Sequence, residues 1–293
     1  MKKKHKPKDV VFDMVIFLIL VVLVIVTFYP MWYVLAASFS TSTDIAKNPG
    51  ILIWPKEFVT GAYELVFQHP LLLSGFRNTL LILICALPLN IVMTLLCGYF
   101  MAGSGMMWKT PIVAMIMFTM FFNGGLIPSF LNQKSLGLYN NLWALIVPGA
   151  LSVYNAIICK TAIEAIPDSL KESAVIDGAN DLQVICKIIL PLMKPTIAVL
   201  LLYYGVGHWN SWFPASIYIK DSRLLPIQNI IRAILIENTS LGGVAGDVGD
   251  RFNYYAETIK YAAIVVTTVP ILCIYPFLQK YFAKGVMIGA VKG

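Results

Sequence analysis

Long apolar stretches separated by short polar segments are the feature that most restricts how this chain can fold. The first, residues 14–37, contains no charged side chain and is long enough to cross a bilayer as a helix. It exceeds the core of a signal peptide, about 7–15 residues, so we expect an uncleaved helix. Five more predominantly apolar stretches lie at 78–102, 111–122, 142–163, 195–212 and 258–278. We expect residues 123–125 (Asn-Gly-Gly) to break the helix after 122, and 214–255 to form a polar outer segment. Because backbone polar groups inside a bilayer must bond within their own segment, the sequence predicts an all-α membrane protein with six transmembrane helices.

The charge of the chain is distributed unevenly between the two sides of the predicted topology. The net charge is +7, although only 13% of the residues are charged and 58% are hydrophobic. The inner segments carry 13 basic and 7 acidic residues, whereas the outer segments carry 9 and 8. This asymmetry follows the tendency of Lys and Arg to stay on the cytoplasmic side. We therefore expect both termini in the cytoplasm, with membrane lipid and not nucleic acid as the partner of this charge.

Several motifs of catalysis and ion coupling are missing from the sequence. No predicted helix carries Asp, Glu, Lys or Arg at its centre, where ion-coupled carriers place their proton or sodium path. The phosphate-binding pattern G-x-x-x-x-G-K-[ST] does not occur, and the five cysteines include no C-x-x-C pair. His5, His69 and His208 lie away from the helix centres. The sequence therefore favours a non-catalytic subunit without a metal site over a secondary ion-coupled carrier or an intramembrane enzyme.

The segment 168–194 is polar and lies between two apolar stretches on the predicted cytoplasmic side. Ser169 and Glu172 have the spacing of a capping box, in which each side chain bonds the backbone N–H of the other residue. The expected helix runs over 169–177 and ends at Gly178, because glycine best tolerates the left-handed conformation that closes a helix.

This first helix has Leu170, Ala174 and Asp177 on one face, and a second helix follows it. Asn180 is expected to cap the second helix, and Pro191 to end it by removing a backbone N–H. The first helix is shorter than the length at which an isolated helix is stable. It therefore needs a surface, which its own transmembrane helices, the membrane or the groove of a soluble partner can supply.

The polar segment resembles the signature loop of binding-protein-dependent ABC importer permeases, with Ser173 in place of the usual second alanine. The residues that carry this resemblance are Glu172, Ala174, 177–179, Ile188, 190–191 and Pro195. The resemblance extends from about residue 74 to the end of the chain. Within the family, the oligo- and polysaccharide-importing branch, which includes alginate importers, is similar at 122–128, 136–140, 207–210 and 281–293.

This resemblance implies a type I ABC importer permease in the cytoplasmic membrane of a bacterium. Such a permease works with a second permease (here expected to be a different chain), two ATPase subunits and an extracytoplasmic solute-binding protein. ATP and Mg²⁺ would bind to the ATPases, and no cofactor to this chain. The helix at 169–177 would couple to an ATPase cleft. The coupling residues that the resemblance implies are Ser169, Leu170, Glu172, Ala174, Asp177, Gly178, Ala179 and Pro191.

The domain organisation that follows has three parts. Residues 1–73 hold the basic start, the first helix and an outer loop; 74–280 form the importer core with the coupling loop 168–194; and 281–293 form a cytoplasmic tail. By resemblance, the glycine-rich outer segment 241–250 reaches into the solute-binding protein, and a merely flexible loop is the alternative.

Aromatic and amide side chains near the helix ends are the candidates for a sugar path, since sugars stack on rings and bond to amides. The candidate residues are Asn90, Asn123, Asn155, Tyr203, Tyr204, His208, Trp209, Asn210 and Trp212. An interfacial aromatic belt and interhelical hydrogen bonds explain the same residues equally well. An oligo- or polysaccharide, with alginate or a similar acidic glycan first, is the expected substrate. A permease for a different sugar and a secondary ion-coupled carrier are the alternatives.

Overall fold

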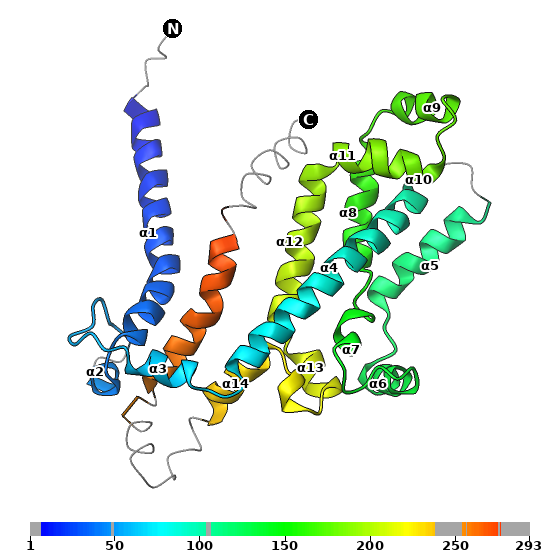
Figure 1. The fold of residues 1–293 in the computed structure, drawn as a ribbon. Coiled ribbons are helices and arrows are strands. Elements are labelled where there is room, and N and C mark those ends of the chain that lie inside the picture. The colour runs from blue at the N-terminus through cyan, green and yellow to red at the C-terminus, as the bar shows by residue number, and fades with distance from the viewer. Residues whose placement is uncertain are drawn as a thin grey trace. The chain divides into compact units, whose positions relative to one another are not determined.

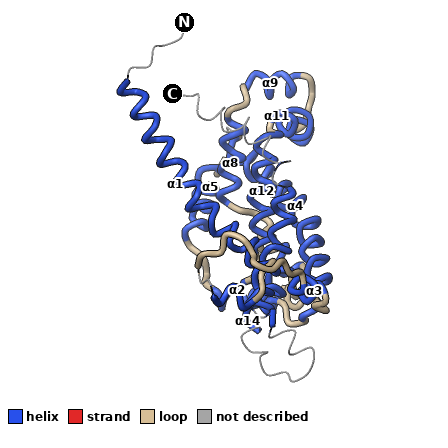
Figure 2. The backbone as a smooth tube through the Cα atoms, turned by 90° about the vertical axis from the view of Figure 1, so that its left-hand side faces the viewer, coloured by secondary structure: helices blue, strands red, loops and turns tan. Residues whose placement is uncertain are grey.

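The computed structural model describes residues 7–47, 50–103, 107–237, 254–255, 257–274 and 276, and all regular elements in these ranges are helices (Figures 1 and 2). The predictions for the first lysines of the chain, the glycine-rich segment 241–250 and the tail 281–293 lie outside the described residues. The chain divides into two compact units. The first contains Met1–His69 and Ile231–Val269, and the second contains Pro70–Ile230 and Pro270–Gly293.

The first unit is built around α1 (Pro7–Ser38), whose apolar side chains from Val11 to Val26 are exposed, as expected for a helix that faces lipid. Aromatic residues near the C-terminal end of α1 bond to the loop around residues 50–53. The Tyr29 hydroxyl donates to the Gly50 carbonyl at 2.8 Å, and the Trp32 Nε1 donates to the Ile53 carbonyl at 2.7 Å. Tyr33 packs edge-on against Tyr261. The other helices described in this unit are α2 (Ser42–Lys47), α3 (Gly61–Phe67) and most of the helix Glu257–Ile274.

The second unit contains α4 (Leu72–Ala102), which packs along α8 (Val153–Glu164) and α12 (Lys194–Asn210). Figure 1 shows these three helices side by side. Pro88 lies inside α4 without ending it. The remaining elements are α5 (Lys109–Phe121), α6 (Leu126–Ser135), α7 (Trp143–Ile146), α9 (Asp168–Ile176), α10 (Asp181–Val184), the π turn η1 (Ile185–Ile189), α11 (Leu190–Leu192), α13 (Phe213–Tyr218), the 3₁₀ turn η2 (Ser222–Leu224) and the start of α14 (Ile227–Glu237).

Three of the described helices are long and apolar enough to cross a membrane, and up to five if each bent pair counts as one crossing. The bent pairs are α5 with α6, at 114°, and the segment 181–192 with α12, at 87°. The first bend falls at Asn123, Gly124 and Gly125, where the sequence predicts a helix break. The count of six crossings and the cytoplasmic position of the termini stay predictions.

The stretch 142–163, expected as one helix, is divided in the structure. α7 ends at Ile146, residues 147–152 are non-helical, and α8 begins at Val153. The prediction was wrong because Pro148 lies within this stretch, and a proline in a helix interior removes a backbone hydrogen bond and clashes with the preceding turn. The segment 214–255, expected as a polar loop, also contains regular structure, namely most of α13, η2 and α14.

The contact between α4 and α8 depends on a glycine. A Cβ atom added to Gly98 would lie 2.7 Å from Cys159 Sγ and 3.2 Å from the backbone nitrogen of Lys160. Since a backbone atom cannot move aside cheaply, the two helices require a residue without a side chain here.

We expect Gly98→Ala to destabilise the protein by about 1–3 kcal/mol, because overpacking forces the helices apart. Thermal unfolding of the purified protein in detergent measures this cost. The matched control is Gly207→Ala in α12, where no atom lies within 4 Å of the added Cβ. The control should be as stable as the parent protein or more so, since alanine favours a helix. Equal stability of Gly98→Ala and Gly207→Ala would contradict the close contact.

Candidate functional site: a coupling loop and a cavity

The polar loop begins with α9, whose N-cap is Pro167. No side chain caps this terminus, and Ser169 lies inside the first turn, so the predicted capping box between Ser169 and Glu172 is wrong. The helix starts earlier than expected because the proline already has the extended conformation that precedes a helix. Asp168 occupies the first helical position and pairs with Lys171 at 3.0 Å.

The C-terminal end of α9 confirms the prediction that Gly178 ends this helix. This residue has a φ of 82°, in the left-handed region. The backbone N–H of Gly178 donates to the Val175 carbonyl at 3.0 Å, and that of Ala179 donates to the Ala174 carbonyl at 2.9 Å. These two bonds form a Schellman motif, which satisfies the last carbonyls of a helix. The turn therefore fixes the direction in which the chain leaves α9.

The residues predicted to couple divide into two groups. Ala174 is buried and Ala179 is partly buried, and both contact an apolar cluster formed by α4, α8, η1 and α12. The others are exposed, namely Ser169, Leu170, Glu172, Asp177, Gly178 and Pro191. Apolar side chains share the exposed surface, and Ile176 is 85% accessible. α9 thus rests on the bundle through small residues and leaves a mixed apolar and acidic face free. Coupling itself stays a prediction.

The second helix of the loop continues through the residue that was expected to end it. Asn180 caps it, in a reciprocal capping box with Gln183. The prediction that Pro191 ends this helix is wrong, because Pro191 lies inside α11. The π turn before it explains the difference: the N–H of Leu190 donates to the Ile185 carbonyl five residues back. This wider turn displaces the carbonyl that the proline ring would otherwise meet.

The loop is also tied to α4. The hydroxyl of Tyr99, near the end of α4, donates to Asp181 Oδ1 at 2.8 Å. Val184, Ile189 and Met193 are buried in the apolar cluster that Ala174 contacts. α9 and the rest of the loop are therefore packed against α4, α8 and α12, the contacts that a rigid-body motion would require.

At the opposite end of this unit from α9, the structure contains a cavity of about 590 Å³. Its lining comes from α6, α7, the break at 147–152, α8, α12 and α13. Among the predicted path residues, four line it: Asn155, Tyr203, Tyr204 and His208. Hydroxyl and amide groups that the sequence interpretation missed complete the polar lining, namely Ser129, Gln133, Ser152, Ser211 and Tyr218. Ser129 and Gln133 are four residues apart on α6, and this helical spacing after the predicted break was the available signal.

Asn90 does not line the cavity, but it bonds to backbone that does. Its Nδ2 donates to the carbonyls of Gly149 at 2.7 Å and Ala150 at 3.1 Å, and its Oδ1 lies 3.0 Å from His208 Nε2. The break before α8 leaves these carbonyls without helical partners, and non-helical backbone at membrane depth must be satisfied by protein. Asn90 is completely buried. This side chain therefore makes the broken helix possible.

Tyr204 joins the same wall of the cavity from α12. Its hydroxyl accepts from the backbone N–H of Ser152 at 2.9 Å and lies 2.7 Å from Thr94 Oγ1. The Ser152 hydroxyl in turn accepts from the backbone N–H of Asn155, which caps α8. The polar groups of α4, α8 and α12 are thus held in fixed positions around the cavity.

The remaining four predicted path residues do not line the cavity. Trp209 is buried and faces Phe76, with ring centroids 6.4 Å apart. Asn123 accepts from the backbone N–H of Gly125 and so stabilises the bend after α5. Asn210 is exposed, and Trp212 contacts Phe213. A role for these four in a substrate path stays a prediction.

Broken apolar helices around a mainly apolar cavity with polar groups in its wall, and a short exposed helix at the other end of the bundle, are the architecture of a membrane transport subunit. The comparisons with known proteins agree. Residues 78–288 match the family described as the binding-protein-dependent transport system inner membrane component. The chain belongs to this family.

Two curated relatives from Bacillus subtilis (strain 168) are similar over nearly the whole chain. The polygalacturonan/rhamnogalacturonan transport system permease protein YtcP is 38% identical over 98% of this chain and 100% of its own length. Protein LplC is 39% identical, over 92% of this chain and 90% of its own. The crystal structure of a bacterial ABC transporter involved in the import of the acidic polysaccharide alginate matches with a TM-score of 0.85 and 26% identity. That match covers 95% of this chain and 99% of the other.

These findings confirm the family and the fold implied by the resemblance. The chain is a permease component of a binding-protein-dependent ABC importer, with the type I fold, and its described regular elements are all helices.

Proposed function

We propose that this chain forms half of the membrane path for a uronate-containing oligo- or polysaccharide. The observation that carries this proposal is the cavity, whose lining offers rings, amides and hydroxyls but, among its described lining residues, no carboxylate. Such a surface stacks sugar rings and bonds their hydroxyls without repelling an anionic chain. The relative named for polygalacturonan and the neighbour named for alginate support an acidic glycan.

The proposed assembly contains a second, different permease, two ATPases that bind ATP and Mg²⁺, and an extracytoplasmic solute-binding protein in a bacterial inner membrane. Its support is the family, together with a solved complex of the alginate transporter and its oligosaccharide-bound periplasmic protein, whose likeness to this chain shows the fold. ATP binding would close the ATPases around α9 and tilt the bundle. A ligand of this kind acts by favouring one of two conformations.

The test is reconstitution of the chain in proteoliposomes with the second permease, the ATPases and the solute-binding protein. We expect ATP hydrolysis to rise when the binding protein is loaded with trigalacturonate or an alginate trimer, and not when it is offered maltotriose. Labelled trigalacturonate should accumulate only when ATP is present on the side of the vesicle membrane that holds the ATPases. Accumulation by the chain alone, driven by a sodium or proton gradient, would instead establish the ion-coupled carrier.

A further inference from the structure

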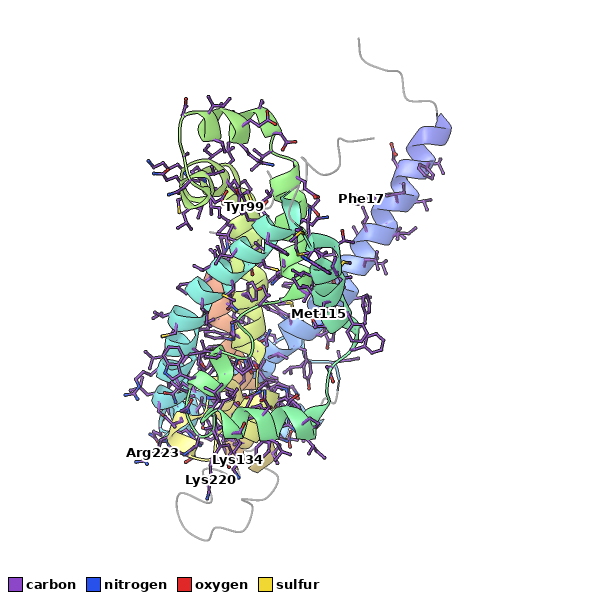
Figure 3. The ribbon with its side chains drawn as sticks, turned by 90° about the vertical axis from the view of Figure 1, so that its right-hand side faces the viewer. Phe17, Tyr99, Met115, Lys134, Lys220 and Arg223 are labelled. Carbon is purple, nitrogen blue, oxygen red and sulfur yellow. The ribbon has the colours of Figure 1, made fainter. Side chains whose placement is uncertain are left out.

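Two exposed lysines, Lys134 and Lys220, lie within two residues of side chains that line the cavity, and we call them the rim lysines. Lys134 follows the cavity-lining Gln133 on α6, and Lys220 comes two residues after the cavity-lining Tyr218. Figure 3 shows both, with Arg223, at the end of the unit opposite Tyr99. In the predicted orientation this is the outer end, where a substrate arrives.

Asn140 and its neighbour Tyr139 contact the chain at both rim lysines. It adopts a left-handed φ of 53°, and its Oδ1 accepts from the backbone N–H of Lys220 at 2.9 Å and of Asp221 at 2.8 Å. Its own N–H donates to the Tyr218 carbonyl at 2.8 Å. The preceding residue, Tyr139, has the Nζ of Lys134 5.9 Å from its ring centroid. The segment 139–140 therefore contacts the Lys134 side chain and the backbone at Lys220. Phe130, which is edge-on to Tyr139 and stacked on Tyr218, adds to this packing.

The charge of the rim lysines is not compensated within the described part of the chain, where no carboxylate pairs with either of them. The nearby Arg223 differs, since its guanidinium bonds Asp221 at 2.8 Å. Hydrogen bonds from Arg223 lower the pKa of Asp221, which therefore stays ionised at neutral pH and neutralises that arginine. Within the described ranges, the rim thus carries two positive charges that no carboxylate pairs.

A side chain of α6 that lines the cavity also holds an unsatisfied acceptor. Gln133 Oε1 is buried and has no hydrogen-bond partner in the structure. A buried acceptor without a partner costs free energy, so a turn of this side chain toward a hydrogen-bond donor in the cavity is favoured. The hydroxyl groups of a sugar supply such donors.

We propose that α6 and the segment 219–221 form an entry site for an anionic sugar chain. The rim lysines bind a carboxylate of one sugar residue, and Gln133 accepts a hydrogen bond from a hydroxyl of the next. This inference rests on the proposed function and adds the residues that select for charge. Selection for the anion takes place at the rim, whereas the uncharged cavity behind it binds rings and hydroxyls.

The test uses the complete reconstituted importer and two substrates of the same backbone, trigalacturonate and its uncharged methyl ester. In Lys134→Gln/Lys220→Gln, we expect the KM for trigalacturonate to rise on the order of tenfold, as the loss of two exposed charge contacts allows. The dependence of this KM on salt concentration should weaken, because the charges that salt screens have been removed. The maximal rate and the uptake of the methyl ester should stay unchanged. Lys56→Gln, an exposed lysine of the other unit, is the matched control and should behave as the parent.

A second variant tests the acceptor separately. Gln133→Leu should raise the KM for both substrates, because both carry the hydroxyl groups. Three results would overturn the inference while leaving the proposed function intact: an unchanged KM in the double lysine variant, an equal loss for charged and esterified substrate, or an unaffected Gln133→Leu. An equal loss of uptake for the charged and the esterified substrate would indicate that the lysines contact the solute-binding protein and not the sugar. Failure of the parent importer to take up either substrate would instead defeat the proposed function.

Discussion

Gly178→Val is expected to abolish ATP-driven import while the protein still inserts and folds. The residue has a φ of 82°, and no atom lies within 4 Å of an added Cβ, so the whole effect comes from the backbone. An L-residue in this conformation costs about 1–2 kcal/mol, and a β-branched one suits it worse. The turn would relax, the Schellman bonds would open, and α9 would change its direction relative to α10. The measurements are ATP-driven uptake and the ATPase response to loaded binding protein.

The matched control at the same position is Gly178→Asn, because asparagine tolerates the left-handed conformation. We expect this variant to keep most of its import activity. If the valine variant transports as well as the asparagine variant, the geometry of this turn does not matter for coupling. If both variants lose transport equally, the glycine matters for a contact and not for its backbone.

Asn90→Leu is expected to lower the free energy of unfolding by about 3 kcal/mol or more, since each buried group left unsatisfied costs about 1–3 kcal/mol. The substitution removes the partner of the Gly149 and Ala150 carbonyls and of the His208 ring. For a domain of this size the loss corresponds to a fall in Tm of roughly 10 °C. Thermal unfolding of the purified protein in detergent measures it, and uptake should fall because the break beside the cavity loses its support.

Asn210→Leu provides the comparison for this experiment. Asn210 is exposed at the end of α12, and surface substitutions change stability by about 0.5 kcal/mol or less. Its Tm should therefore stay near that of the parent. A parental Tm in Asn90→Leu would mean that water or another group satisfies the carbonyls, and that Asn90 does not hold the broken helix.

Local chemistry made much of the secondary structure predictable. Apolar runs located α1, α4, α5 and α12, and a glycine pair located the bend after α5. Gly178 and Asn180 were correctly assigned to the end of one helix and the cap of the next. The errors arose where two local signals competed. α14 was missed although Ile227, Ile230, Ile231 and Ile234 have helical spacing, because polar neighbours obscured the pattern.

The site was predictable only in part. Residue type pointed to Asn155, Tyr203, Tyr204 and His208, which line the cavity. It could not separate them from Trp209, which has the same aromatic character but faces the protein interior. Gln133 was not recognised, since its position depends on how sharply α6 turns away from α5.

The sequence by itself determined that this chain lies in a membrane, where its main helices run, and which family it belongs to, because hydropathy, helix breakers and motif residues act over a few neighbouring positions. The tertiary structure alone decided that Asn90 supports a broken helix, that the alanines of the coupling loop face inward, and that the segment 139–140 contacts the chain at both rim lysines. These relations join residues that are tens of positions apart. Their pairing depends on how the helices pack, and no local pattern records it.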